Sequence, residues 1–241
     1  MLSWAKLVKR SDDLLRLNTY VTMHGKRHAA MSASYVLSEK GSEMVNDKPE
    51  QERAKAKRAS IEKATIDLLL QEGMSSVTHR HVAARAGVPV GSIGYYYESR
   101  EKLIQTCFER FHAVQAAILE EALKNPKIRE DRRELAAATL DLVTCGHRDW
   151  VRGIISATVD AEREAPALQE MVKEQFYEAV NAIDALLKYA GVTKADGNAI
   201  LGAIVGSSLV VAGWDKPVVE TTIGGVVRFL ELAEGPQSEN E

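Results

Sequence analysis

The chain has 241 residues, of which 45% are hydrophobic and 27% charged, with 31 Lys and Arg against 34 Asp and Glu and a formal net charge of −3. This composition is typical of a folded protein of one or two domains, and it excludes a fibrous or wholly disordered chain. No apolar run reaches the length of about 18 residues that a membrane span needs, and no secretory signal is recognised, so we expect a cytoplasmic protein without a membrane partner.

Residues 1–50 show no sustained hydrophobic period. A weak helical pattern of leucines begins at Leu2, so this segment is predicted to be an N-terminal arm, either mobile or a short extra helix. His24 and His28 have the spacing of two metal ligands on a helix, but no third ligand accompanies them, and we predict no metal site. Met31 and Met44 are further candidates for the start of the protein.

Two helices are predicted after this arm. Apolar residues recur at helical spacing from Ile61 onward, and Gly73 is predicted to end the first helix, as glycine does at many helix C-termini. Thr78 is predicted to cap the second helix, because its hydroxyl can accept hydrogen bonds from the free N–H groups of the first turn. The second helix extends to Ala86, and Gly87 then allows a tight turn.

A short third helix and a longer fourth helix follow the turn. The third contains Gly91 to Tyr97 after the stop at Pro89, and the fourth begins after the capping residue Ser99 and extends through Phe111. Two helices joined by a short glycine turn are typical of the helix-turn-helix, whose second helix enters a DNA major groove. A three-helix packing unit that binds no DNA remains the alternative on spacing alone.

The charge of the chain is distributed unevenly. Residues 51–104 carry 9 basic and 6 acidic side chains, whereas residues 105–241 carry 14 basic and 22 acidic ones. A basic segment beside a strongly acidic one indicates that the first segment meets a polyanion and the second does not.

The sequence from Thr78 to Ile104 resembles the DNA-binding motif of the tetracycline-repressor (TetR) family of bacterial regulators. The family pattern is Thr, an aliphatic-Ala pair, Ala-Gly-Val, Gly-Ser/Thr-aliphatic, an aromatic cluster and Ser-Lys-Glu-x-Leu. The matching residues here are Thr78, Val82-Ala83, Ala86-Gly87-Val88, Gly91-Ser92-Ile93, Tyr95-Tyr96-Tyr97 and Ser99-Arg100-Glu101 with Leu103. With the helix before it, the resemblance covers about residues 52–104.

The resemblance implies a set of DNA contacts. Arg100 would neutralise a phosphate at the start of the fourth helix, and Tyr97 matches a position that packs inside the small domain. The chain departs from the family at Gly94, where an aromatic residue is usual, and at Val90, where a Lys or polar residue is frequent, so the operator sequence is left open. The expected DNA contacts are Thr78, Arg80, Val90, Gly91, Ser92, Tyr95, Tyr96 and Arg100.

The rest of the chain is predicted to be helical, with no alternating strand pattern of any length. We therefore expect an all-α fold of about nine core helices: an arm at 1–50, a helix-turn-helix domain at 51–104, an effector-binding and dimerisation domain at 105–235, and a tail at 236–241. Helices after the third are predicted at about 101–124, 130–147, 149–164, 166–190, 195–213 and 217–233. The resemblance of this half to the TetR family is one of architecture.

The last two predicted helices indicate a homodimer. The stretch from Ala199 to Val211 is apolar or small on every face, which predicts a helix buried on all sides. Gly202 and Gly206 have a G-x-x-x-G spacing that permits close backbone approach. By resemblance, these two helices pair with their counterparts in a four-helix interface, and the expected interface residues are Gly202, Gly206, Val210, Ile223, Val227 and Leu230.

Aromatic and polar residues on the mid-domain helices are the candidates for a small-molecule site. Their grouping favours an apolar or aromatic effector. The residues are Phe108, Phe111, His112, Trp150, Met171, Phe176 and Tyr177.

These features together predict a DNA-binding transcriptional regulator. We expect a repressor that binds a palindromic double-stranded operator as a dimer and is released by the effector. No hydrolase, phosphate-binding or dinucleotide-binding motif occurs, so we expect no enzyme and no cofactor, and we expect Cys107 and Cys145 to be small buried residues. A helical ligand-binding or scaffolding protein, or an enzyme, is the alternative, which would leave the motif at 78–104 unexplained.

Overall fold

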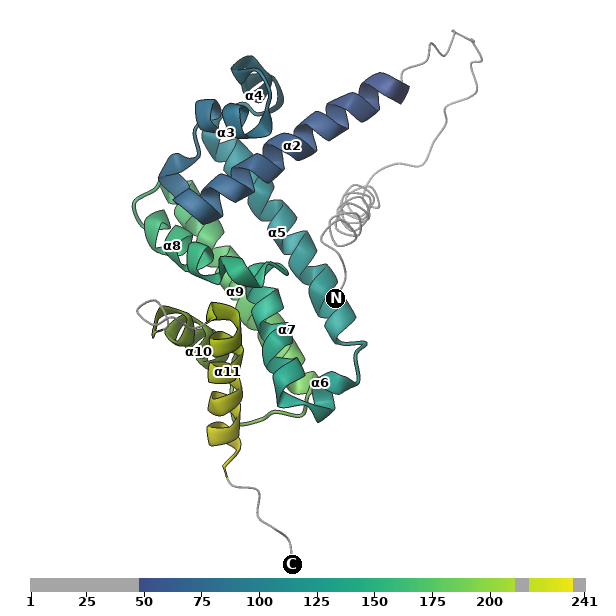
Figure 1. The fold of residues 1–241 in the computed structure, drawn as a ribbon, viewed down its shortest axis with the longest axis vertical. Coiled ribbons are helices and arrows are strands. Elements are labelled where there is room, and N and C mark those ends of the chain that lie inside the picture. Colours follow the sequence, from purple (N-terminus) through teal and green to yellow (C-terminus); the bar gives the residue numbers. More distant parts are fainter. Residues whose placement is uncertain (1–47, 211–216, 236–241) are drawn as a thin grey trace, which may run out of the picture.

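The computed structural model describes residues 48–210 and 217–235, and over these residues the chain is all-α, without a strand (Figure 1). The predicted fold class is confirmed. The predictions for residues 1–47, the histidine pair His24 and His28 among them, lie outside the described residues. The ten α-helices and two 3-10 turns of the described part are α2 (Lys48–Glu72), η1 (Met74–Ser76), α3 (His79–Ala86), α4 (Val90–Tyr96), α5 (Arg100–Ala122), α6 (Lys127–Glu130), α7 (Arg132–Thr144), η2 (Arg148–Trp150), α8 (Val151–Ala161), α9 (Pro166–Tyr189), α10 (Gly197–Val210) and α11 (Val218–Glu234).

The local signals around the helix-turn-helix are confirmed. Thr78 Oγ1 accepts a hydrogen bond from the His81 N–H at 3.2 Å, and Ser99 Oγ accepts one from the Lys102 N–H at 3.1 Å. Gly87 ends α3 in the left-handed conformation, with φ of 66°, which a residue with a Cβ adopts only with strain. These three residues therefore fix the ends of α3 and the start of α5.

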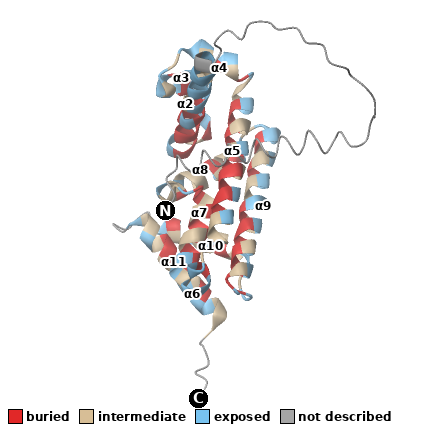
Figure 2. Ribbon diagram, turned by 90° about the vertical axis from the view of Figure 1, so that its right-hand side faces the viewer, coloured by how far each residue is buried: buried red, intermediate tan, exposed pale blue. Residues whose placement is uncertain are grey.

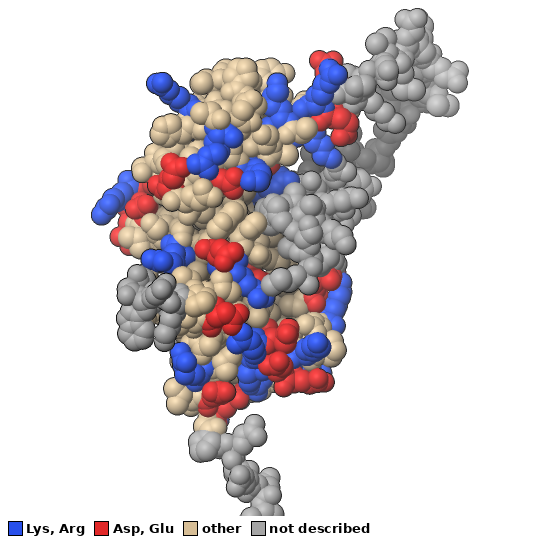
Figure 3. Space-filling view, viewed as in Figure 1, with Lys and Arg blue, Asp and Glu red and all other residues tan. Residues whose placement is uncertain are grey.

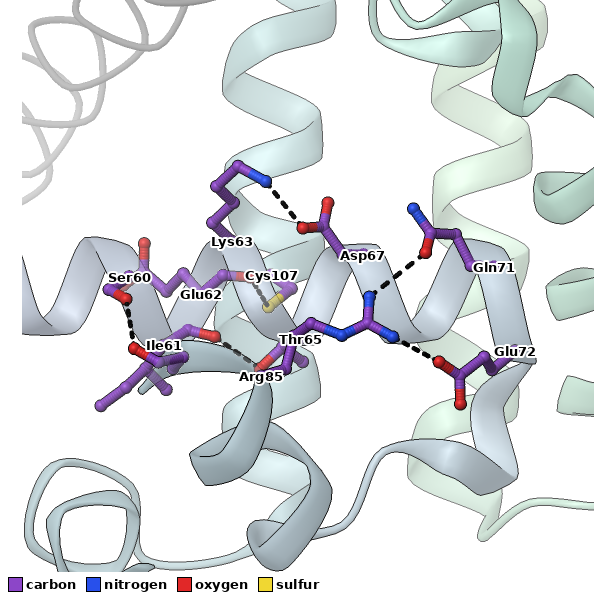
Figure 4. Close-up of polar contacts among 11 residues, drawn as sticks. Ser60, Ile61, Glu62, Lys63, Thr65, Asp67, Gln71, Glu72, Arg85 and Cys107 are labelled. Carbon is purple, nitrogen blue, oxygen red and sulfur yellow. Dashed lines mark hydrogen bonds and ion pairs between the residues drawn. The ribbon is translucent and has the colours of Figure 1, made fainter. Parts of the chain in front are cut away.

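Helix α2 anchors the helix-turn-helix from behind (Figure 4). Ser60 Oγ donates a hydrogen bond to the Ala86 carbonyl at 3.1 Å, and the Arg85 guanidinium donates to Gln71 Oε1 at 3.2 Å and also pairs with Glu72. These contacts hold the middle and the C-terminal end of α2 to the last turn of α3.

Helix α5 links the two halves of the molecule. It runs without a break from the small helical unit at the top of Figure 1 into the larger bundle of α7, α8 and α9, and its buried residues form a continuous stripe in Figure 2. Leu103 and Cys107 are completely buried on this stripe. The domain boundary that we predict after residue 104 therefore falls inside a continuous helix.

The helix predicted at 130–147 has different ends in the structure. The helix expected at 130–147 is interrupted at Asp131, whose carboxylate accepts a hydrogen bond from the Arg133 N–H at 2.7 Å and so starts α7 afresh. Helix α7 ends at Thr144, since Cys145 takes a left-handed conformation with φ of 49°. The cap formed by Asp131 thus decides where α7 begins, although the apolar period of the sequence continues across this position.

Within the single chain, α10 is buried on one face only. Ile200 and Ile204 are completely buried in α10, whereas Gly202 and Gly206 are exposed. A Cβ built on either glycine would meet nothing within 4 Å, so the G-x-x-x-G spacing makes no close contact inside the chain. The close approach of α10 and α11 occurs instead at Gly225, where a Cβ would lie 1.9 Å from Ser207 Oγ.

Candidate functional site

The helix-turn-helix presents one exposed face. Tyr95 is 82% exposed and Val90 is 51% exposed on α4, and Thr78 and Arg80 are exposed at the start of α3. Gly91 is also exposed, whereas Ser92 and Tyr96 are half-buried. Seven of the eight predicted DNA contacts therefore lie together around α3 and α4, on a surface with no helix above it in Figure 1.

Buried residues fix the orientation of this face. Ile93 on the inner side of α4 is completely buried. Tyr97 is 6% exposed, in agreement with its predicted position inside the small domain. The Tyr97 hydroxyl donates to Glu62 Oε1 at 3.0 Å, and the same carboxylate pairs with Arg110 at 2.5 Å. Burial and the neighbouring Glu62 raise the pKa of Tyr97, so the hydroxyl stays protonated and remains a donor.

The first turns of α2 bring positive charge beside α4. The Arg58 guanidinium lies 5.1 Å from the centre of the Tyr96 ring, a cation–π contact between the two helices. Lys55 is exposed one turn earlier on the same side of α2. Sequence reasoning noted these basic residues but did not place them beside the reading helix, because their position depends on how α2 packs. Basic side chains at the top of the molecule are visible in Figure 3.

Arg100 differs from the other seven predicted contacts. Its guanidinium donates to both carboxylate oxygens of Glu164, at 2.8 and 2.9 Å, and to the carbonyls of Val77 at 2.8 Å and Met74 at 2.7 Å. The hydrogen bond with Glu164 raises the pKa of Arg100. Arg100 thus ties η1 to the segment between α8 and α9, and in this structure it does not project toward the exposed face.

An apolar cavity lies between the small helical unit and the bundle. Its volume is about 70 Å³, and α2 contributes Leu69 and Leu70 to its wall while α5 contributes Phe108 and Phe111. The two phenyl rings meet edge to face, with centroids 5.8 Å apart. The remaining lining residues come from α7, its C-cap, α8, α9 and α10: Val143, Thr144, Cys145, Ile154, Ala157, Thr158, Val172, Gln175, Phe176, Ala179 and Leu201.

A wider and more open groove lies between α5 and α9. Its volume is about 810 Å³, and Phe108 lines both this groove and the apolar cavity. His112 and Met171 line the groove together with the carboxylates Glu109, Glu174 and Glu178. The groove therefore carries acidic side chains, which the apolar cavity lacks.

The structure divides the seven predicted effector residues into three groups. Phe108, Phe111 and Phe176 line the cavity, and His112 and Met171 line the groove. Trp150 lines neither, because its indole stacks on the His147 ring with centroids 3.8 Å apart. Tyr177 lines neither and is 71% exposed on the outer side of α9.

The sequence patterns do not identify several residues at or beside the cavity. Leu69 and Leu70 lie in the apolar pattern of α2, which predicts a packed helix and no cavity, and the local sequence does not single out Gln175. Gly153 gave no signal at all, yet a Cβ there would lie 1.8 Å from the Leu70 carbonyl oxygen. The backbones of α8 and α2 thus touch directly beside the cavity.

The predicted dimer residues are also divided. Gly202, Gly206 and Val210 are exposed on α10, where Leu209 is 51% and Val210 64% exposed. Ile223 and Leu230 are instead buried in the core of their own chain, at 2% and 0% exposure, and Val227 is half-buried. Because α11 uses these two side chains to pack on the bundle, they are not free to meet a partner.

Cys107 and Cys145 are free thiols in the core, as expected. Burial raises the pKa of both, that of Cys145 to about 12, so neither is a reactive thiolate. Among the described residues, no group of three His, Cys, Asp or Glu side chains could hold a metal ion. No helix in the described ranges is both long and apolar enough for a membrane span.

A comparison with known protein families matches only the N-terminal part of the described chain. Residues 61–107 match the sequence profile of the bacterial regulatory proteins of the tetR family. The match covers the end of α2, the helix-turn-helix and the start of α5. No curated protein matches the sequence.

Solved structures match over most of the described chain. A transcriptional regulator of the TetR/AcrR family has a TM-score of 0.59 at 16% identity, over 73% of this chain and 100% of that one. A transcriptional regulator from Saccharomonospora viridis in complex with choline has a TM-score of 0.57 at 14% identity, over 72% and 94%. A TetR-family regulator from Streptomyces coelicolor has a TM-score of 0.55 at 20% identity, over 76% and 94%. At these identities the likeness is one of fold.

Proposed function

We propose that this chain, whose residues 61–107 match the profile of the tetR-family regulators, is a transcriptional repressor that a small-molecule effector releases from DNA. It binds a palindromic operator as a homodimer. Its location is the cytoplasm, which contains the DNA. TetR-family proteins are regulators rather than enzymes, and we assign no catalytic residue.

The DNA contacts of the proposal come from the exposed face of α3 and α4. Arg80 and Tyr95 reach outward and are offered to phosphates and base edges, and Thr78, Val90, Gly91, Ser92 and Tyr96 surround them. We add Arg58 and Lys55 of α2 as phosphate contacts beside the reading helix. Gly94 is exposed, and a Cβ there would meet nothing within 4 Å. The fold would therefore have room for the aromatic residue that is usual at this position in the family.

A dimer is required because α4 has only seven residues and reads few base pairs. Two copies held a helical turn or more apart read two half-sites, and their spacing then decides affinity. We propose that the exposed face of α10, with Gly202, Gly206, Leu209 and Val210, forms the interface. Small and apolar exposed residues on one helix are suited to close packing against a second copy.

One observation carries the effector part of the proposal: α2 and α5 both belong to the DNA-binding unit, and both line the apolar cavity. A ligand against Leu69, Leu70, Phe108 and Phe111 therefore pushes directly on the two helices that carry the reading face. A protein of the same fold contains choline, but we propose only the existence of a ligand site here and not its ligand.

The test is selection from a random pool of duplex DNA of about 30 base pairs with the full chain. We expect enrichment of an inverted repeat, and binding that weakens steeply with salt because phosphates dominate the affinity. Arg80→Ala should abolish the enrichment. A pool without enrichment after repeated rounds would contradict the proposal and favour a helical ligand-binding protein.

A further inference from the structure

Polar atoms in the wall of the apolar cavity determine what it can bind. The Thr144 hydroxyl donates to the Leu140 carbonyl at 2.8 Å, and the Thr158 hydroxyl donates to the Ile154 carbonyl at 2.8 Å. The Cys145 thiol faces the Phe111 carbonyl, with sulfur and oxygen 3.8 Å apart. These three groups have therefore already committed their protons to the backbone.

Gln175 is the exception in this wall. Its Oε1 atom is buried and has no hydrogen-bond partner among the described residues. A buried acceptor without a donor is destabilising, and such atoms are rare in folded proteins. Gln175 lies on α9 and lines the same cavity as Phe108 and Phe111 of α5, and the other side chains of the lining are carbon apart from the three committed groups.

Charge is absent from this wall. Of the described residues that line the cavity, none is Asp, Glu, Lys, Arg or His. An ionised ligand would lose its hydration and gain no opposite charge, which is strongly unfavourable. The cavity thus selects against cations and anions, although the groove beyond Phe108 is acidic.

From these observations we propose that the effector is an uncharged, largely apolar small molecule with one hydrogen-bond donor, a hydroxyl or N–H group, which Gln175 Oε1 accepts. The inference rests on the proposed function in that it takes this cavity as the effector site. With their protons committed, the two threonine oxygens also can only accept, so a donor on the ligand matches the hydroxyl oxygens of the wall as well as Gln175 Oε1.

The size of the cavity limits the ligand further. Its volume of about 70 Å³ is about half of the roughly 150 Å³ that encloses benzene in an engineered cavity. A ring-sized ligand therefore extends past Phe108 toward the groove or moves the Phe108 and Phe111 rings. Phenol and toluene are suitable probes, because they have nearly the same shape and differ only in a hydroxyl or a methyl group.

The experiment measures the dissociation constants of phenol and toluene for the full chain without DNA, by ligand-observed NMR. The readout is the ratio of the two constants in the wild type and in Gln175→Leu. Loss of one net hydrogen bond of about 1 kcal/mol should shift this ratio about fivefold in favour of toluene. Gln175→Met is the second variant, and Lys173→Leu on the exposed side of α9 is the matched control, which should leave the ratio unchanged. We expect benzoate and benzylammonium not to bind.

Two results would overturn the inference. One is the same ratio in the wild type and in both folded Gln175 variants. The other is stronger binding of benzaldehyde, which only accepts hydrogen bonds, or of a charged probe than of phenol. Since no DNA is present, a failure here leaves operator selection untouched, and a failure of operator selection leaves this measurement valid.

Discussion

Arg100, at the start of α5, could either contact a DNA phosphate or form an ion pair inside the protein. The resemblance implies a phosphate contact, but the structure gives the guanidinium Glu164 and two backbone carbonyls as partners. We predict that Arg100→Ala lowers the free energy of unfolding by about 1–3 kcal/mol, because it leaves charged and polar partners unpaired. The measurement is urea denaturation of the wild type and the variant.

The salt dependence of DNA binding distinguishes the two roles of Arg100. Arg80→Ala should reduce the slope of log affinity against log salt by about 0.9 per lost phosphate contact. Arg100→Ala should leave that slope unchanged at salt concentrations where the variant is folded. An equal reduction by both variants would show that Arg100 leaves Glu164 and contacts phosphate in the complex.

His147 gives the protein a pH-dependent stability. Burial lowers its pKa, Lys63 lowers it further, and Asp67 and Asp149 oppose the shift only in part. The unfolded chain therefore binds the proton more readily, so this contribution is intact above the ordinary histidine pKa of about 6.5 and is lost as pH falls below it. We predict that His147→Leu makes the unfolding free energy less dependent on pH between pH 7.5 and pH 5.5. Equal pH dependence in denaturant titrations of the two proteins would contradict this.

At the scale of the element, we propose that α2 contacts DNA as well as lining the cavity. Its last turns belong to the cavity wall, while its exposed Lys55 and Arg58 flank α4. We predict that Lys55→Ala with Arg58→Ala weakens DNA binding on all sequences and lowers the salt slope by up to about two phosphates' worth. Lys173→Ala with Lys188→Ala removes the same charge from exposed positions of α9 and is the control, for which binding should not change.

At the scale of the whole molecule, the proposed homodimer interface is the exposed face of α10. Gly206 is exposed and a Cβ there would meet nothing in its own chain within 4 Å, so Gly206→Leu should fold normally. We predict that the variant is a monomer at micromolar concentration and binds the selected operator weakly, since the added side chain keeps a second α10 away. Sedimentation and thermal unfolding together check this, and a variant as dimeric as the wild type would place the interface elsewhere.

Local signals determined much of this protein from the sequence alone. Thr78 and Ser99 cap helices through hydrogen bonds to N–H groups three residues away, and Gly87 needs only its own backbone freedom. Such interactions close within one turn of chain, and so the four helices around the motif and the exposed face of α4 follow from the order of the residues.

Tertiary structure decided the features that join distant segments. Arg100 meets Glu164 across 64 positions of sequence, and Gly153 meets the backbone of Leu70 because α8 packs on α2. The local sequence does not distinguish Gln175 from other polar residues of an amphipathic helix, yet the packing of α9 places this residue in the cavity wall and leaves its Oε1 buried without a partner among the described residues. Side-chain burial and pairing of this kind depend on where each helix lies, because contacts between helices are set by packing and not by the local period of the sequence.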